Sequence, residues 1–142
     1  FRELVAHQGG DTRVIEDPGL LPQARDAIPV SARTAGTVRR LDALSIGRAA
    51  NALGAGRTTK DDAIDPAVGV EVVRKVGERV EASGVLAVLH VNDPKNLTEA
   101  RRLVESAYDI DPKGAPCVPP SLIVERVQGD RASPPSEECP TA

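Results

Sequence analysis

Short apolar runs separated by glycine fill the middle of the chain, and they restrict its fold more than any other feature. These runs occupy residues 68–73, 76–80 and 85–91. They are rich in valine and too short for most helices, and Gly84 separates the last two. Such runs are typical of strands joined by tight turns. We therefore expect a strand at each, with further strands at 28–32, 37–41 and 122–127.

Two other segments have the apolar spacing of helices. After Asp42, a good N-cap residue, apolar residues recur at i, i+3, i+4 and i+7 up to Leu53, and Gly54 can end the helix. A second helix is expected to begin near Asn96 and to end before Pro112, with Tyr108 on its apolar face. The predicted class is α+β (mixed α/β): a small hammerhead-like or barrel-sandwich-like β domain with two packed helices.

The two ends of the chain differ in composition from its middle. Residues 1–6 have the character of the last turns of a helix, stopped by the glycines at 9 and 10, and the proline-containing stretch up to Pro29 resembles a linker. The tail from 129 to 142 is rich in Pro, Ser and Glu and is expected to be disordered. The chain contains no Met, so we expect it to be a piece of a longer protein.

Composition excludes two classes of partner. Phe1 and Tyr108 are the only aromatic residues, and the net charge of the 142 residues is −3. A nucleic-acid surface needs stacking rings or a basic excess, so no nucleic-acid partner is expected. No apolar run approaches the ~20 residues that cross a bilayer, so no membrane partner is expected either. The expected location is the cytoplasm.

Cysteines and histidines give no sign of a metal or nucleophile site. Cys117 and Cys139 are far apart, which favours free thiols in a reducing compartment. His7 and His90 have no second ligand at the spacing that a zinc site needs. His90 lies in a predicted strand and is expected to face outward or to be hydrogen-bonded.

The polar loop after the first predicted helix is the segment most suggestive of chemistry. Its glycines and Lys60 resemble a phosphate loop, but the Walker spacing is absent and the loop follows a helix C-terminus, which disfavours anions. The carboxylates of Asp61, Asp62 and Asp65 suit a hard cation. The alternation of an EF-hand loop is missing, so a solvated acidic loop is favoured over a metal-dependent small enzyme.

Residues 76–86 resemble half of a biotinyl- or lipoyl-type barrel sandwich. A carrier domain of that type places its lysine in a Met-Lys-Met or Asp-Lys-Ala setting, and neither occurs in the sequence. Lys75 and Lys95 stand in other contexts. A cofactor carrier is therefore excluded, whereas a standalone binding or scaffold module without enzymatic activity stays open as the alternative.

Longer ordered motifs resemble one enzyme family. The segments concerned are 47–57, 65–70, 75–80 and 89–93, together with 1–11 at the start. In this order they resemble the C-terminal domain of thymidine phosphorylase and pyrimidine-nucleoside phosphorylase. The resemblance implies two parts, with 1–29 as the end of the catalytic part and a linker and 30–128 as the C-terminal domain. The tail at 129–142 lies outside the resemblance. Residues 81–86 depart from the family's Gly-Glu-Pro-Leu turn.

The resemblance also implies a function for the parent enzyme. Members of the family catalyse the reversible phosphorolysis of pyrimidine nucleosides as homodimers, with phosphate as co-substrate, in salvage or catabolism. Their catalytic residues lie upstream, so none is expected in this chain, which should be inactive and mostly monomeric by itself. No cofactor or metal is expected, and the partner is the upstream catalytic domain. Gly54, Ala55, Gly56 and Arg57 match the start of a loop that becomes ordered when the family's domains close.

Overall fold

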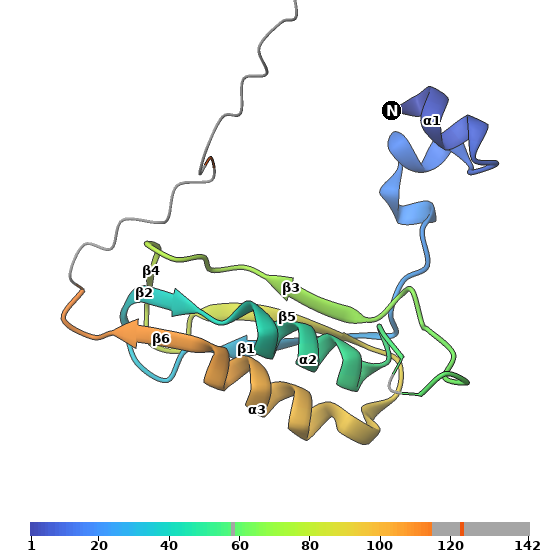
Figure 1. Cartoon of the computed structure of the whole chain (residues 1–142). Helices are drawn as coiled ribbons and strands as arrows, with labels where there is room; N and C mark the ends of the chain where they lie inside the picture. Colours follow the sequence, from blue (N-terminus) through green and yellow to red (C-terminus); the bar gives the residue numbers. More distant parts are fainter. Residues whose placement is uncertain (58, 115–122, 124–142) are drawn as a thin grey trace, which may run out of the picture.

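Two small antiparallel sheets and two helices form the body of the protein. The computed structural model describes residues 1–57, 59–114 and 123. One sheet has the strand order β1 (Asp26–Ser31), β5 (Val85–Val91), β3 (Gly69–Val72), and the other has the order β4 (Arg79–Val80), β2 (Gly36–Leu41), β6 (Tyr108–Asp111). Helices α2 (Ala43–Leu53) and α3 (Leu97–Ala107) lie side by side over one face of the strands (Figure 1). The predicted α+β class with two packed helices is confirmed.

The central strand β5 explains why the apolar run at 85–91 is nearly continuous. Leu89 is fully buried and lies between Ile28 of β1 and Val70 of β3 on the face that meets the helices. The next residue, His90, has the opposite direction, as alternation along a strand requires. Its Nε2 lies 3.3 Å from Glu71 Oε2, so the prediction of a hydrogen-bonded strand histidine is confirmed.

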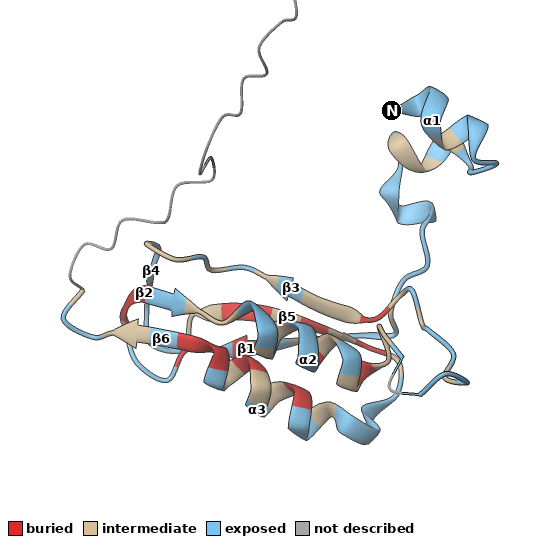
Figure 2. Ribbon diagram, in the orientation of Figure 1, coloured by how far each residue is buried: buried red, intermediate tan, exposed pale blue. Residues whose placement is uncertain are grey.

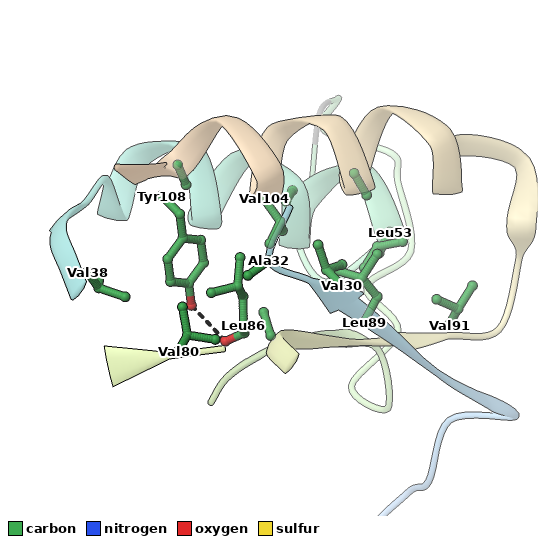
Figure 3. Close-up of a cluster of buried hydrophobic side chains, with 14 of the residues drawn as sticks. Val30, Ala32, Val38, Leu53, Val80, Leu86, Leu89, Val91, Val104 and Tyr108 are labelled. Carbon is green, nitrogen blue, oxygen red and sulfur yellow. Dashed lines mark hydrogen bonds between the residues drawn. The ribbon is translucent and has the colours of Figure 1, made fainter. Parts of the chain in front are cut away.

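Tyr108 joins the two sheets from inside the core. Its ring points down from the start of β6, and its hydroxyl lies 2.8 Å from the carbonyl oxygen of Leu86 in β5 (Figure 3). The same hydroxyl is 3.0 Å from the Arg74 carbonyl oxygen, just beyond β3. Since one hydroxyl has one proton, it donates to these two carbonyls alternately. The contact connects β6 of one sheet with β5 and the end of β3 in the other.

Two of the predicted elements are wrong in extent. The second helix ends at Ala107, and Tyr108 to Asp111 form β6, which pairs with β2. Tyr108 is predicted on the apolar face of that helix, but it begins β6, and its hydroxyl there bonds to the Leu86 and Arg74 carbonyl oxygens. The strand predicted at 76–80 is reduced to β4, because Lys75 to Glu78 form a turn. Glu78 N–H donates to the Lys75 carbonyl over 3.1 Å, and Gly77 within the turn has φ 90°.

The remaining predicted strands and helices are close to the observed ones. β1, β2, β3 and β5 differ from their predicted ranges by two residues or fewer, and α2 begins directly after Asp42, whose side chain accepts from Ser45 N. Gly36 belongs to β2, where a Cβ would stand 2.4 Å from the Asp111 carbonyl oxygen. The strand predicted at 122–127 lies outside the described residues except for Ile123. The tail predicted at 129–142, Cys117 and Cys139 lie outside them too.

The N-terminal segment contributes no side chain to the core. It contains α1 (Arg2–His7) and two 3₁₀ turns, η1 (Thr12–Ile15) and η2 (Pro18–Leu20). None of residues 1–24 is buried (Figure 2). Apolar side chains lie in solvent there, with Phe1 85% and Leu4 55% exposed. The division of the chain at residues 29 and 128 stays a prediction.

Titration of Tyr108 tests its burial directly, since the chain has no other tyrosine and no tryptophan. Burial, and to a smaller extent the charge of Glu78, raises its pKa to about 12. The stability that the neutral hydroxyl contributes is therefore complete below about pH 10 and is lost as the pH rises through about 12. We expect tyrosinate absorbance to appear with a midpoint near 12 in the folded chain and near the ordinary value of about 10 in denaturant.

The matched variant Tyr108→Phe keeps the ring and removes the hydroxyl. It should lower the free energy of unfolding by about 1 kcal/mol at neutral pH, the usual net value of one hydrogen bond. It should also reduce the loss of stability between about pH 10 and 12. A folded-state midpoint near the ordinary value for tyrosine would contradict the buried hydrogen bond.

Candidate functional site

The loop between α2 and β3 begins at a helix end of well-defined geometry. Gly54 has φ 103°, in the left-handed region that favours glycine, and its N–H donates to the Asn51 carbonyl over 3.0 Å. Ala55 N–H donates to the Ala50 carbonyl over 3.0 Å. These two bonds are the paired closing bonds of a Schellman motif. Gly54 and Ala55 therefore have a structural role at the C-terminus of α2.

The other end of this loop is held by Asp65. Its backbone N–H donates to the Gly54 carbonyl oxygen over 3.0 Å, so the two ends of the loop lie together. Its side chain accepts hydrogen bonds from Asn92 Nδ2 at 2.7 Å and from Ala67 N–H at 2.9 Å. The Asn92 bond and then the Ala67 bond hold the pKa of Asp65 below its ordinary value, against the opposing effect of burial. We name residues 54–65 the closure loop.

A polar hollow of about 460 Å³ lies beside the base of the closure loop. The end of α2 and the start of the loop form one wall, with Asn51, Gly54 and Gly56. The turn after β5 forms the other wall, with Asn92 and Asn96. Asn96 Nδ2 donates to the Ala52 carbonyl at 3.0 Å and so connects the two walls.

The acidic residues of the closure loop are engaged in local turns. The Asp62 carboxylate accepts from Thr59 N–H at 2.7 Å and from Thr59 Oγ1 at 2.6 Å. Asp65 is held by Asn92 and Ala67, and Asp61 is exposed. Within residues 1–57, 59–114 and 123, no three His, Cys, Asp or Glu side chains are grouped closely enough to hold a metal ion. The carboxylates of Asp62 and Asp65 thus stabilise turns within the loop.

The four residues that the sequence singles out, 54 to 57, have different positions in the structure. Gly54 and Ala55 belong to the Schellman motif, Gly56 borders the hollow, and Arg57 is exposed on the loop beyond it. A role in domain closure stays a prediction for all four. The contact of Asn92 could not be predicted from the sequence, because no local pattern connects a residue after β5 with Asp65, 27 positions earlier.

The fold and this loop define a small α+β domain with two packed helices and an anchored surface loop. Comparison with known proteins identifies the family to which this domain belongs. The family model described as "Pyrimidine nucleoside phosphorylase C-terminal domain" matches residues 37–111, which is 75 of the 142 residues. The match runs from the second residue of β2 to the last residue of β6. The chain therefore belongs to the pyrimidine nucleoside phosphorylase C-terminal domain family, as the sequence motifs predict.

Curated relatives carry the similarity beyond the range of the family model. The chain is 42% identical over 123 residues to pyrimidine-nucleoside phosphorylase of Bacillus subtilis, covering 87% of this chain and 28% of that protein. It is 36% identical over 127 residues to the enzyme of Geobacillus stearothermophilus, covering 89% of this chain and 29% of that protein. It thus spans less than a third of these relatives. Among the described residues, no helix is long and apolar enough to cross a membrane.

Acid unfolding tests the hydrogen bonds that the Asp65 carboxylate accepts. Because its pKa is lowered in the folded state, the stability contributed by its carboxylate is complete above about pH 4 and is lost as the pH falls through the lowered value. Asp65→Asn should therefore lower the melting temperature at neutral pH, and the difference from the native chain should shrink in acid. Thermal unfolding followed by circular dichroism across this range measures both.

The same substitution at Asp61 provides the control. Asp61 lies on the same loop and is exposed, so Asp61→Asn should leave the melting temperature unchanged within error. A difference for Asp65→Asn that is the same at every pH would contradict the assigned hydrogen bonds.

Proposed function

We propose that the protein to which this chain belongs is a pyrimidine-nucleoside phosphorylase that acts on thymidine. An oxygen of inorganic phosphate attacks the anomeric carbon of the nucleoside, and the bond from that carbon to the base nitrogen breaks. The electron pair leaves with the base, which takes up a proton and departs as thymine, and 2-deoxyribose 1-phosphate forms. The observation that supports this most is the match of the family model, which covers helices α2 and α3 and every strand except β1.

In this proposal the chain supplies no catalytic group. The parent enzyme works in the cytoplasm as a homodimer in pyrimidine salvage or catabolism, with phosphate as co-substrate and with no cofactor bound by this domain. The C-terminal domain supports closure over the substrates, which excludes water and completes the site. The closure loop suits this role, because its ends are hydrogen-bonded to each other while Arg57 extends into solvent.

The proposed partner of the domain is the upstream catalytic part of the same protein. The N-terminal segment supports this, because Phe1, Leu4, Leu20 and Leu21 are each at least half exposed. Apolar side chains grouped in a short segment without a core of its own are typical of a surface that another part of the protein covers. The isolated chain is expected to be mostly monomeric.

The first experiment identifies the native product and measures its activity. An antibody raised to this chain should detect a band several times heavier than 14.9 kDa in extract of the source organism. The purified product should release thymine from thymidine only when phosphate is present, and uridine serves as the competing substrate that measures specificity. The isolated chain should release none. A native product of the chain's own size would favour the standalone binding or scaffold module.

A substitution at Arg57 separates a closure role from a structural one. Arg57→Ala in the full-length enzyme should lower kcat/KM about tenfold, because a loop that closes over the site contributes to catalysis only in the closed state. The melting temperature should stay nearly unchanged, since Arg57 is exposed. Arg102→Ala, a matched change at an exposed arginine of α3, should leave both quantities unchanged. Native kinetics in the Arg57 variant would count against the closure role.

A further inference from the structure

The side chain of Asn92 connects three segments that are far apart in the sequence. Its Oδ1 accepts a hydrogen bond from the backbone N–H of Arg25 at 2.7 Å, at the point where the N-terminal segment enters β1. Its Nδ2 donates to Asp65 Oδ2, also at 2.7 Å, at the end of the closure loop. Asn92 itself follows β5 directly, so its position is determined by the central strand of the sheet.

The bond to Asp65 reaches both ends of the closure loop. Asp65 N–H is bonded to the Gly54 carbonyl at 3.0 Å, and Gly54 is the residue that ends α2. A displacement of Asn92 therefore moves Asp65 and, through it, the start of the loop. A displacement of Arg25 moves the same carboxamide through the hydrogen bond from Arg25 N–H to Asn92 Oδ1. The linker and the loop thus share one hydrogen-bonded attachment at Asn92.

We propose that Asn92 is a positioning residue, which fixes the base of the closure loop to the end of the linker so that the two move together. This inference rests on the proposed function for its catalytic consequence. When the linker shifts as the domains close, the loop is carried into place with its base already ordered. Asn92 touches no substrate in this proposal and acts only through Asp65 and Arg25.

The hydrogen bonds at this point permit an exchange of the two side chains. In Asn92→Asp the acceptor for Arg25 N–H remains, but two carboxylates face each other. In Asp65→Asn the acceptor for Ala67 N–H remains, but two carboxamide NH₂ groups face each other. The double variant restores a donor–acceptor pair between the two positions and retains both backbone acceptors. A double-mutant cycle therefore isolates the contact between them.

Hydrogen exchange of the 142-residue chain measures the attachment without any enzyme assay. Each single variant should speed exchange of the Asp65 amide about tenfold, while the Arg25 amide stays protected. Asn92→Ala should speed exchange of both amides, since it removes donor and acceptor together. The double variant should return the Asp65 amide to within about twofold of the native rate. Unchanged exchange at Asp65 in both single variants would overturn the attachment.

Kinetics of the full-length protein measure the consequence. Each single variant should lower kcat/KM for thymidine about five- to tenfold, and the double variant should recover it to within about twofold. A purely structural role would lower the melting temperature and leave kcat/KM per folded molecule at the native value, which would overturn the positioning role. A native full-length protein without phosphorolysis would overturn the proposed function instead, and the exchange data would still decide the attachment.

Asp42→Asn is the matched control. Asp42 likewise accepts one backbone N–H and one side-chain donor, both from Ser45, but it lies at the opposite end of α2 from the closure loop. The change should leave the Asp65 exchange rate and kcat/KM within about twofold of native values. A fall in kcat/KM equal to that of Asp65→Asn would show that replacing a carboxylate by a carboxamide perturbs the enzyme wherever it is made, and would overturn the specific role of Asn92.

Discussion

The hydroxyl of Tyr108 makes a directed polar contact between the two sheets from inside the apolar core. The core around it consists of valine, alanine and leucine side chains, and the chain's other aromatic residue, Phe1, is 85% exposed. Small aliphatic side chains provide burial without direction, since the hydrophobic effect is roughly proportional to area. The tyrosine adds a directed hydrogen bond from β6 in one sheet to the Leu86 carbonyl of β5 in the other.

The closure loop is likewise positioned by two kinds of contact, apolar packing of the helices and directed hydrogen bonds at the base of the loop. Helices α2 and α3 pack against the sheets through apolar side chains, which places the end of α2 close to the turn after β5. Polar side chains then determine the local geometry there, with Asn96 bonded to the Ala52 carbonyl and Asn92 bonded to Asp65. The result is a loop with a fixed base and an exposed arginine. That combination is what the proposed closure role requires.

Residues near one another in the sequence account for the parts of the fold that were predicted correctly. The nearly continuous apolar run of β5, the Asp42 cap and the stop at Gly54 each involve residues within about seven positions, so the sequence displays them directly. The end of α3 was wrong because Tyr108 extends the helical spacing, while its partners Leu86 and Arg74 are 22 and 34 positions away. An alternation of period two from Tyr108 to Asp111 was the available signal for β6.

By itself, the sequence determined the α+β class, most strand and helix positions and membership of the pyrimidine nucleoside phosphorylase C-terminal domain family. Local spacing and ordered motifs are properties of the linear chain, so they can be detected without coordinates. Only the tertiary structure decided that Tyr108 belongs to a strand and that Asn92 joins the linker to the closure loop. Both depend on which distant backbone groups need a hydrogen-bond partner, and these groups come together only when the helices pack on the sheets.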